Sequence, residues 1–567
     1  MILSHQSIKI FKMFKGANMK TVLKLTALSL AFMAATAQAY EKDKVYHFTI
    51  LHNNDIHGHF WASDKGEYGF AAQKTLVDRI KKEVETKGGS VILLNAGDIN
   101  TGVPESDMQN ARPDIEAMNE IGYEAMTLGN HEFDNPLQLL DMQEKWAKFP
   151  FLSANVYNSK TGKPLVKPYI LLNKNGLKVA IVGLTTEDTA KLGNPEYMGL
   201  VRFDDPTVTA RKVLAELQKT EKPDIKIALT HMGYYYDANF GSNAPGDVSM
   251  ARKLEHQAFD VIVGAHSHDT VCVDDQGVWI KDYKPAQPCR PDFQNGTWIM
   301  QAGEWGKFLG RADFEFKNGE TKLVNYQLIP VNLKEKIKTA DGKTEYRYYT
   351  EEIPQDEALL AKLKHYKDEG DKLLNEKVGE THGRLEGERN VVRFKQTNLG
   401  RLIAESQRAR VNADVGILNS GVVRASIDNG DITYRNVLTV MPFGNAVSYV
   451  DFNGKELQDY LNVVALKETD SGAYPQFTGD ISMVIDFKNK TVTEIKIKGE
   501  PLSADKKYRV SVPNYSASGG DGYPNIKSHP TYVDTGFIDA DVLKAFFEKN
   551  SPIDAAKFEP KGEIIYK

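Results

Sequence analysis

The first half of the chain repeats one pattern that strongly limits its possible folds. Short, almost wholly apolar runs end in Gly, Asn, Asp or His, and segments with helical spacing, such as 70–86, lie between them. The runs occupy 45–55, 90–98, 124–131, 176–185, 224–233 and 259–268. Continuous apolar strands with helices between them are typical of an α/β sheet covered on both faces. Ligand sites in such sheets lie at the carboxyl ends of strands, so the polar residues there are the first candidates for chemistry.

The chain, at 567 residues, is too long for one core and divides into two parts. Nine of its thirteen histidines lie between residues 47 and 268. A densely charged segment, 351–379, has leucines at helical spacing, Pro near its start and Gly at its end, and is predicted to be a linker helix. We therefore expect domains at 40–350 and 380–567. The second domain mixes strands and Gly-rich turns with helices expected at 397–411, 454–466 and 539–549.

The N-terminus is predicted to be a targeting segment outside the fold. Residues 1–18 are interpreted as an upstream extension and 19–39 as a secretory signal, with lysines, an apolar run and an A-x-A motif before Tyr40. The apolar run is too short to span a bilayer comfortably, which disfavours the alternative of a retained membrane anchor. After cleavage the chain would carry 66 basic and 76 acidic residues, a formal charge of −10. A net negative charge does not favour nucleic-acid binding, and an anionic substrate would need local positive charge from metals or arginines.

The sequence contains two cysteines, Cys272 and Cys289. In an exported protein such a pair most simply forms one disulfide that closes a short loop. Closing the loop is worth roughly 3 kcal/mol in the chain-entropy model. The alternative is a pair of buried, unpaired thiols.

The polar residues at the strand ends are of the types that bind metals. They are Asp55, His57, Asp98, Asn130, His131, His231, His266 and His268. If the strands lie in packed sheets with their carboxyl ends together, these side chains meet at one point. Imidazole nitrogens and carboxylate oxygens suit divalent transition metals, and so many ligands exceed what one tetrahedral ion needs. The set suits two ions a few Å apart with a bridging carboxylate, the arrangement used for displacement at phosphorus.

Each of these residues, taken singly, is weak evidence. A lone His after an apolar run is most often an ordinary residue, and His52, His59 and a solvent-facing His256 are interpreted in that way. The polar turn at 129–136 could also be simply solvated. The recurrence of ligand-type residues at five strand ends favours chemistry instead.

The same motifs, in this order, resemble the calcineurin-like metallophosphoesterase signature. They are DIH at 55–57, AGD at 96–98, GNHEFD at 129–134, THM at 230–232 and GAHSH at 264–268. Downstream, VRFKQTNLGRL, NSGVVRASI, MPFGNAV and NYSASGGDGYP resemble the C-terminal domain of the secreted 5′-nucleotidase family. The similarity covers essentially all of 40–567. It implies a four-layer α/β/β/α metallophosphoesterase sandwich, α+β overall, joined by a helix to a smaller α/β nucleotide-binding domain.

The resemblance implies metal-binding roles for the strand-end residues. Two metals would be held by Asp55, His57, Asp98, Asn130, His231, His266 and His268. Asp98 would bridge them. Similar proteins have Gln at position 268, so an oxygen ligand becomes a nitrogen here, which favours zinc or another later transition metal. We expect two divalent ions, Zn²⁺ first with Mn²⁺ or Co²⁺ as alternatives, which would lower the pKa of a bound water and supply the nucleophile.

The resemblance also implies a catalytic pair. His131 would sit beside the scissile phosphate and stabilise the charge that develops on its oxygens. Asp134 would hold the imidazole in orientation and raise its basicity. Glu132, between them, is expected to point away and to bond locally.

The second half would then select the substrate. Phe443 and Tyr515 resemble the two aromatic residues that sandwich a nucleobase in this family; the usual residue at 515 is Phe, and Tyr keeps the ring face. Asn445 would contact the base, and Asp521 would contact the ribose hydroxyls. Planar cations for the anionic groups would come from Arg389, Arg393 and Arg424.

Together these features predict a periplasmic, monomeric hydrolase of small molecules. By resemblance it would remove the 5′-phosphate from nucleotides and split the pyrophosphate of UDP-sugars, with the 351–379 region as a hinge between the domains. Two alternatives stay open: a 2′,3′-cyclic-nucleotide 2′-phosphodiesterase/3′-nucleotidase, and a non-catalytic nucleotide-binding or adhesion protein. The second is disfavoured because every ligand-type position is filled. No membrane association is expected after signal cleavage.

Overall fold

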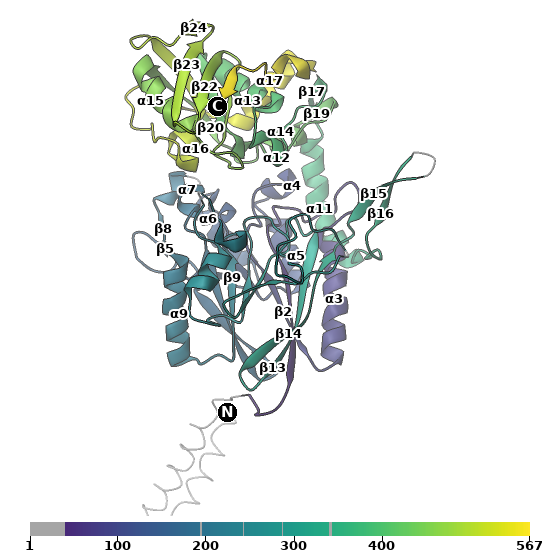
Figure 1. The fold of residues 1–567 in the computed structure, drawn as a ribbon. Helices are drawn as coiled ribbons and strands as arrows, with labels where there is room; N and C mark the ends of the chain where they lie inside the picture. Colours follow the sequence, from purple (N-terminus) through teal and green to yellow (C-terminus); the bar gives the residue numbers. More distant parts are fainter. Residues whose placement is uncertain (1–39, 193–194, 242, 286, 340–342) are drawn as a thin grey trace, which may run out of the picture.

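The computed structural model describes residues 40–567 except 193–194, 242, 286 and 340–342. The expected extension and signal peptide at 1–39 lie outside the described residues. Figure 1 shows a larger N-terminal part, a smaller C-terminal part above it, and helix α11 (Glu357–Leu374) running along one side. Among the helices described, we find none with both the length and the apolar character needed to cross a membrane.

Two six-stranded sheets form the centre of the N-terminal part. The first has the order β14-β13-β1-β2-β3-β4 and the second β11-β12-β10-β9-β7-β6. The first comprises β1 (Tyr46–Asn53), β2 (Ser90–Asn95), β3 (Ala125–Thr127), β4 (Phe151–Leu152), β13 (Phe308–Lys317) and β14 (Glu320–Pro330). The second comprises β6 (Tyr169–Lys174), β7 (Leu177–Thr185), β9 (Ile225–His231), β10 (Val261–Val263), β11 (Asp292–Gln294) and β12 (Thr297–Met300). Strands β1 to β4 are parallel, as are β7, β9, β10 and β12.

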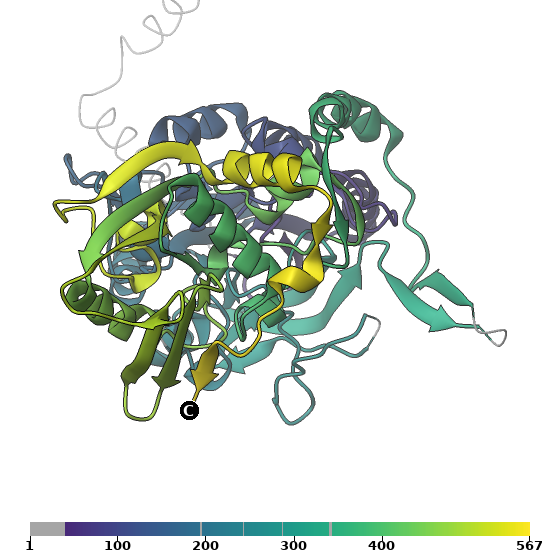
Figure 2. The same cartoon turned by 90° about the horizontal axis from the view of Figure 1, so that it is seen from above.

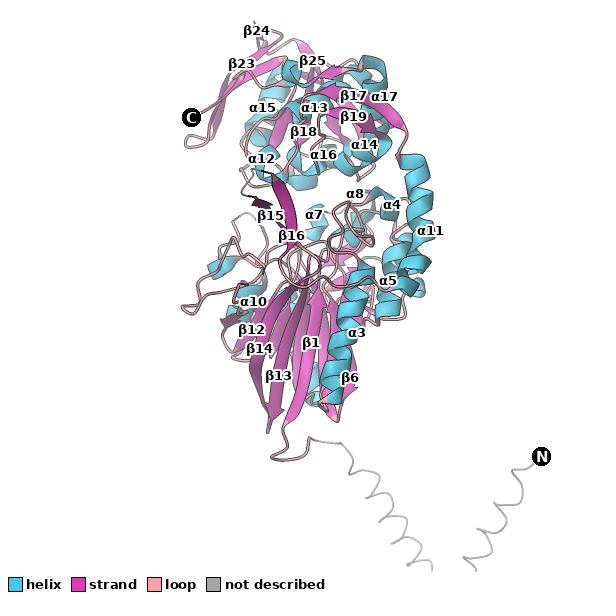
Figure 3. Ribbon diagram, turned by 90° about the vertical axis from the view of Figure 1, so that its right-hand side faces the viewer, coloured by secondary structure: helices cyan, strands magenta, loops and turns pink. Residues whose placement is uncertain are grey.

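The two sheets pack face to face through one apolar layer. Phe48 and Ile92 of the first sheet share a buried cluster with Ile181 and Ile227 of the second. Helices α3 (Phe70–Thr86) and α5 (Arg112–Ile121) cover the outer face of the first sheet, and α9 (Pro206–Thr220) and α10 (Asp247–Lys253) cover that of the second. In Figure 3 the strands run side by side, with α3 and α11 along one side. The order of layers confirms the predicted four-layer sandwich.

Shorter elements complete the N-terminal part. They are α4 (Pro104–Asp107), α6 (Leu137–Trp146), α7 (Thr189–Leu192), α8 (Pro195–Met198), β5 (Val156–Asn158) and β8 (Val201–Phe203). A hairpin of β15 (Lys334–Lys338) and β16 (Thr344–Tyr348) projects from the body, as Figure 2 shows.

Helix α11 is shorter than the linker helix predicted over 351–379. The Asp356 side chain accepts a hydrogen bond from the backbone N–H of Leu359 (2.8 Å), so the helix begins only after this cap. At the other end Lys377 already pairs with Thr433 in a β-ladder. A side-chain cap and a strand pairing therefore end a helix that periodicity alone extends too far at both ends.

The C-terminal part contains three sheets. Their orders are β21-β18-β25-β20-β26, β24-β23-β22-β28 and β19-β17-β27. The strands are β17 (Lys377–His382), β18 (Val415–Asn419), β19 (Gly430–Thr433), β20 (Ala446–Asn453), β21 (Pro475–Phe477), β22 (Ile481–Asp486), β23 (Thr491–Ile497), β24 (Glu500–Pro501), β25 (Lys507–Pro513), β26 (Val533–Ile538), β27 (Ile553–Asp554) and β28 (Ile564–Tyr566). The helices are α12 (Arg389–Val392), α13 (Asn398–Arg410), α14 (Tyr434–Val440), α15 (Gly454–Val464), α16 (Asn514–Ala517) and α17 (Asp539–Asn550). The three helices predicted here are confirmed within two residues as α13, α15 and α17.

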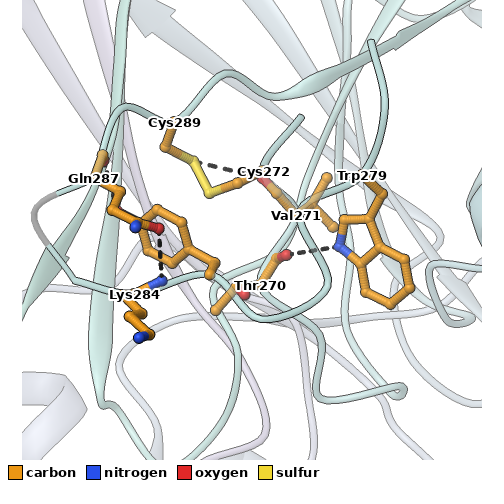
Figure 4. The surroundings of a disulfide bond; sticks show 8 residues. Thr270, Val271, Cys272, Trp279, Lys284, Gln287 and Cys289 are labelled. Atoms are coloured by element: carbon orange, nitrogen blue, oxygen red, sulfur yellow. Dashed lines mark hydrogen bonds between the residues drawn. A yellow bond between two sulfur atoms is a disulfide. The ribbon is translucent and has the colours of Figure 1, made fainter. Parts of the chain in front are cut away.

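The two cysteines form a disulfide, which confirms the predicted pairing (Figure 4). Cys272 and Cys289 have their Cα atoms 4.9 Å apart and close a loop that follows β10. The Trp279 indole N–H donates to the carbonyl of Thr270 (3.1 Å) at the base of this loop. The cross-link thus constrains the chain a few residues beyond His268, one of the predicted metal ligands.

Candidate active site

Five strands deliver the predicted ligand residues to one edge of the sandwich. Asp55 and His57 follow β1, Asp98 follows β2, Asn130 and His131 follow β3, His231 ends β9, and His266 and His268 follow β10. Strands β1, β2 and β3 are parallel to one another, as are β9 and β10. Their carboxyl ends therefore meet, and the structure brings all eight side chains together.

Five of these residues have an unusual backbone conformation. Left-handed φ angles occur at Asp55 (50°), His57 (50°), Asp98 (57°), His266 (85°) and His268 (62°). Such angles are uncommon for residues other than Gly and cluster at functional sites. Backbone hydrogen bonds join the segments that follow β1 and β2. The N–H of Asp55 donates to the carbonyl of Gly97, and the N–H of His57 donates to the carbonyl of Asp98, each at 3.0 Å.

The donor atoms form a continuous cluster centred on Asp98. Its Oδ2 lies 3.0 Å from His231 Nε2 and 3.9 Å from His57 Nε2. His57 Nε2 is 3.2 Å from His268 Nε2, which in turn is 3.4 Å from Asp55 Oδ1. On the opposite side, Asn130 Oδ1 lies 2.7 Å from His266 Nδ1 and 3.2 Å from His231 Nε2. Asp98 thus lies between two groups of donors.

Two of the imidazoles are each oriented by a backbone acceptor on the other ring nitrogen. His57 Nδ1 is 2.7 Å from the Thr101 carbonyl, and His231 Nδ1 is 2.8 Å from the Ala96 carbonyl. Because a carbonyl oxygen only accepts, Nδ1 of each ring carries a proton and Nε2 faces the cluster. Burial opposes protonation of His231, but the Asp98 and Asp55 carboxylates outweigh it and raise the pKa of His231 to about 10. Bonds of this kind fix ring orientation in metal sites.

The composition of the cluster fits divalent cations. Asp55 and Asp98 are fully buried, and neither forms an ion pair with Lys or Arg in the described part of the chain. Buried carboxylates are costly unless they are paired or coordinate a metal. Burial lowers the pKa of His57 and of His266 to about 3, so both rings are neutral and could bind a cation rather than act as counter-ions. Three overlapping groups with donor atoms within 4.8 Å of one another are formed, one by Asp55, His57 and His268, one by His57, Asp98 and His131, and one by Asp98, His231 and His266.

His131 and Asp134 lie beside this cluster as a hydrogen-bonded pair. His131 Nδ1 is 2.6 Å from Asp134 Oδ2, which also accepts from the hydroxyl of Thr101 at 2.7 Å. Burial by itself lowers the pKa of His131, but the Asp134 and Asp98 carboxylates outweigh it and raise the pKa above its usual value. The imidazole can therefore carry a positive charge and direct its Nε2 away from Asp134.

Glu132 does not bond only locally, contrary to the prediction. Its carboxylate is buried and accepts hydrogen bonds from the backbone N–H groups of Gly129 (2.6 Å), Asp98 (3.0 Å) and Ile99 (3.0 Å) and from the Asn100 side chain (3.0 Å). It therefore ties the loop that carries Asp98 to the loop that carries Asn130. The prediction failed because most of these partners are more than thirty residues away in the sequence.

Sequence reasoning also missed Glu304. Its Oε2 accepts from His268 Nδ1 at 2.7 Å, and its Oε1 accepts from Lys307 Nζ at 2.8 Å. Glu304 follows β12 just as the ligand residues follow their strands, so the run TWIMQAGE at 297–304 carried the same signal.

The substrate residues predicted in the second half face the cluster across a cleft of about 890 Å³. The cleft is lined from the C-terminal part by Arg389, Arg393, Arg424, Phe443, Asn445, Tyr515 and Asp521. The ring of Phe443 lies 5.8 Å from the ring of His131, nearly parallel at 19°. All seven residues therefore lie within one cavity that also contains the cluster.

The three arginines concentrate positive charge in this cleft. None of them forms an ion pair with a carboxylate among the residues that the structure describes. Burial, reinforced by Arg389, lowers the pKa of Arg424 to about 10 and that of Arg393 well below its usual value. Arg393 and Arg424 are half-buried and Arg389 is exposed. Unpaired guanidinium groups that line a cleft are typical of sites that receive anionic groups.

Tyr515 makes a contact that Phe could not make. Its hydroxyl donates to Asp521 Oδ1 at 3.0 Å, while the Asn419 side chain donates to Asp521 Oδ2 at 2.8 Å. The Asp521 carboxylate is thereby fixed at the edge of the cleft. Asn445 also lines the cleft, and its carbonyl accepts from the backbone N–H of Asp539 at 2.8 Å.

Comparison with known proteins agrees with this geometry. The model of the calcineurin-like phosphoesterase family matches residues 48–270, and that of the 5′-nucleotidase C-terminal domain matches 377–528. The chain is 56% identical over 550 residues to Protein UshA of Yersinia enterocolitica, a match that covers 97% of this chain and 100% of the relative. The chain belongs to the 5′-nucleotidase family.

Two further similarities support the membership. A 5′-nucleotidase of Vibrio vulnificus is 55% identical over 549 residues, covering 96% of this chain and 99% of the relative. The crystal structure of a 5′-nucleotidase precursor from Thermus thermophilus aligns with a TM-score of 0.74 at 29% identity, covering 92% of this chain and 99% of that one. As a member of the 5′-nucleotidase family this chain is a metal-dependent hydrolase, and its donor clusters together with the fold imply divalent metals. The predicted family, fold class and enzyme class are confirmed.

Proposed function

We propose that this member of the 5′-nucleotidase family removes the 5′-phosphate from nucleotides and hydrolyses the pyrophosphate of UDP-sugars. The observation that carries the proposal is the single cleft that joins the donor cluster to the three arginines and the two aromatic rings. A nucleotide held by its base in the C-terminal part would present its phosphates to the cluster.

The metal ligands in this proposal are Asp55, His57, Asp98, Asn130, His231, His266 and His268. Asp98 would be shared by the two ions, because its Oδ2 lies 3.0 Å from His231 Nε2 and 3.9 Å from His57 Nε2. Nitrogen donors dominate the set, which favours Zn²⁺, with Mn²⁺ or Co²⁺ as alternatives. When bound, the ions supply Lewis acidity and a nucleophile at neutral pH.

His131 and Asp134 act on the phosphate. With Nδ1 on Asp134, the Nε2 of a protonated His131 donates to a phosphate oxygen as negative charge develops there. Arg389, Arg393 and Arg424 orient the phosphates and offset their charge.

The nucleoside is held by the C-terminal part. Phe443 and Tyr515 sandwich the base, which contributes about 1–3 kcal/mol of stacking and tolerates different bases. Asn445 contacts the base. Asp521, fixed by Tyr515 and Asn419, accepts hydrogen bonds from the ribose hydroxyls.

The proposal extends to the organisation of the chain. Residues 40–350 form the hydrolase domain, 380–567 the substrate domain, and the region of α11 is the hinge about which they rotate. The mature protein is exported to the periplasm and is monomeric. Locking the two domains together in the open state with an engineered disulfide should abolish turnover. Unchanged turnover in the locked protein would exclude the hinge.

The test compares turnover with metal content in the purified protein. We expect hydrolysis of AMP and UDP-glucose, two bound divalent ions, and loss of activity on chelation. His131→Ala should lower kcat by about 10²–10³-fold while metal content is unchanged, because only the charge-stabilising group is removed. His256→Ala, at an exposed position, is the matched control. Preference for 2′,3′-cyclic AMP would instead identify a cyclic phosphodiesterase, and loss of metal in His131→Ala would make His131 a ligand.

A further inference from the structure

A second cavity, of about 950 Å³, opens on the other side of the donor cluster. It is lined by His57, which the first cleft does not reach, while Asn130 and His266 line only the first. Both cavities share His268, Glu304 and the three arginines. The two cavities therefore meet at the place where the phosphates are proposed to bind.

The wall of the second cavity is aromatic. Its lining includes Phe60, Trp61, Tyr68 and Trp305. The ring of Trp305 is covered by the stacked ring of His59 (4.6 Å between centroids), whereas Trp61, packed in part against the core, has one described ring contact, with the edge of Phe60 at 6.4 Å. The half-buried Trp61 indole N–H donates no hydrogen bond within the described residues. Trp61 therefore offers both a ring face and a free donor.

The loop that carries Trp61 is held in one conformation. Gly69 has a φ of 86°, and a Cβ there would come within 2.7 Å of the Ala62 backbone nitrogen and 3.0 Å of the Trp61 carbonyl carbon. The backbone N–H of Phe70 donates to the Phe60 carbonyl at 3.1 Å, which closes the loop. The ring of Trp61 is thus presented on a fixed support, as a preorganised site needs.

Charge is distributed unevenly along this cavity. Far from the cluster, Glu105 and Asp371 are neutralised by Lys367 and by Arg435, and Lys367 Nζ lies 3.4 Å from Glu105 Oε1. The unpaired cations are the three arginines at the shared end. A molecule that suits this cavity has its phosphate at the cluster and an uncharged, hydroxylated ring towards Trp61.

We propose that the second cavity is a leaving-group subsite that binds the glycosyl phosphate half of a nucleoside diphosphate sugar. The inference rests on the proposed pyrophosphate hydrolysis. The nucleoside occupies the first cleft, and the water oxygen bonds to the adjacent phosphorus. The bond from that phosphorus to the bridging oxygen breaks, the sugar phosphate leaves with the bridging oxygen and its electron pair, and the protons of water pass to solvent. A hexose stacks its apolar face on the ring of Trp61.

The experiment compares UMP and UDP-glucose, which share the uridine 5′-phosphate group; only UDP-glucose also carries a glycosyl phosphate. Trp61→Ala should lower kcat/KM for UDP-glucose about tenfold and leave that for UMP unchanged. It should also weaken the inhibition of UMP hydrolysis by glucose 1-phosphate. Trp61→Phe, which keeps a ring and is the milder change, should retain part of the preference for UDP-glucose. Phe443→Ala should lower kcat/KM equally for both substrates. Phe293 is 51% exposed and lies outside both cavities, so Phe293→Ala should change kcat/KM for neither substrate.

The outcomes separate this inference from the proposed function. If the enzyme fails to hydrolyse UMP at all, the proposed function is wrong. If UMP and UDP-glucose are both hydrolysed and Trp61→Ala affects them equally or not at all, the subsite is wrong while the function stands. If UDP-glucose is not a substrate and glucose 1-phosphate does not inhibit in a Trp61-dependent manner, the subsite is also wrong. If Trp61→Ala selectively loses activity on diuridine diphosphate, the second cavity is a site for a second nucleoside, which overturns the glycosyl assignment.

Discussion

Replacing Glu132 by Gln should damage the active site without touching a metal ligand. In the structure, Glu132 Oε2 accepts from the backbone N–H groups of Gly129 (2.6 Å) and Asp98 (3.0 Å). Oε1 accepts from the backbone N–H of Ile99 and from the Asn100 side chain, each at 3.0 Å. Both oxygens therefore face only donors. Because the backbone N–H of Asn100 also donates to Oε1 (3.4 Å), a glutamine in either amide orientation places its NH₂ group against at least two of these donors.

The expected cost follows from this count. Two hydrogen bonds to a charged acceptor are lost, each worth about 1.5–3 kcal/mol, so the free energy of unfolding should fall by about 3–6 kcal/mol. Because these bonds set the positions of the Asp98 and Asn130 loops, metal affinity should fall roughly 10–100-fold, as for other residues that orient ligands.

The assay is urea unfolding, combined with titration of divalent metal into chelated protein. Glu120→Gln is the matched control, since Glu120 is 39% exposed and pairs with Lys362 at the surface, where such pairs contribute about 0–1 kcal/mol. A Glu132→Gln protein within about 1 kcal/mol of wild type, with the same metal affinity, would refute the clamp.

Three further changes test other parts of the structure. Asp114 is fully buried, and burial raises its pKa to about 8, so the folded state binds this proton more tightly than the unfolded state. The free energy of unfolding should therefore fall by about 1.4 kcal/mol per pH unit as the pH rises from roughly 4 to 8. Asp114→Asn should lack this pH dependence, and an unchanged slope in the variant would exclude Asp114 as its source. Tyr515→Phe keeps the ring but removes one of the two hydrogen bonds that fix Asp521, so KM should rise about 3–10-fold for UMP and much less for 2′,3′-dideoxy-UMP. An equal rise for both substrates would contradict ribose recognition through Asp521. Cys272→Ser should lower the free energy of unfolding, measured by calorimetry, by roughly 2–4 kcal/mol, to the value of the reduced wild type. A free energy of unfolding equal to that of the oxidised wild type would show that the disulfide contributes nothing to stability.

Local sequence pattern was sufficient for much of this protein. Apolar runs and helical spacing predicted the strands that carry the cluster and the helices α13, α15 and α17, because side-chain periodicity reports directly which face of an element is buried. The polar residues at the strand ends predicted the donor cluster, because parallel strands bring their carboxyl ends to one edge of a sheet. The disulfide followed from a single cysteine pair.

The relations between distant segments were decided only by the tertiary structure. Glu132, read alone, belongs to a polar turn, but the fold places it under the backbone of Asp98 and makes it a clamp. Glu304 meets His268, and Tyr515 fixes Asp521, through contacts that no periodicity encodes. The left-handed backbone at Asp55, His57 and Asp98 likewise occurs together with hydrogen bonds between the segments that follow β1 and β2. Sequence pattern reports burial along one element, whereas these features depend on which elements the packed sheets bring into contact.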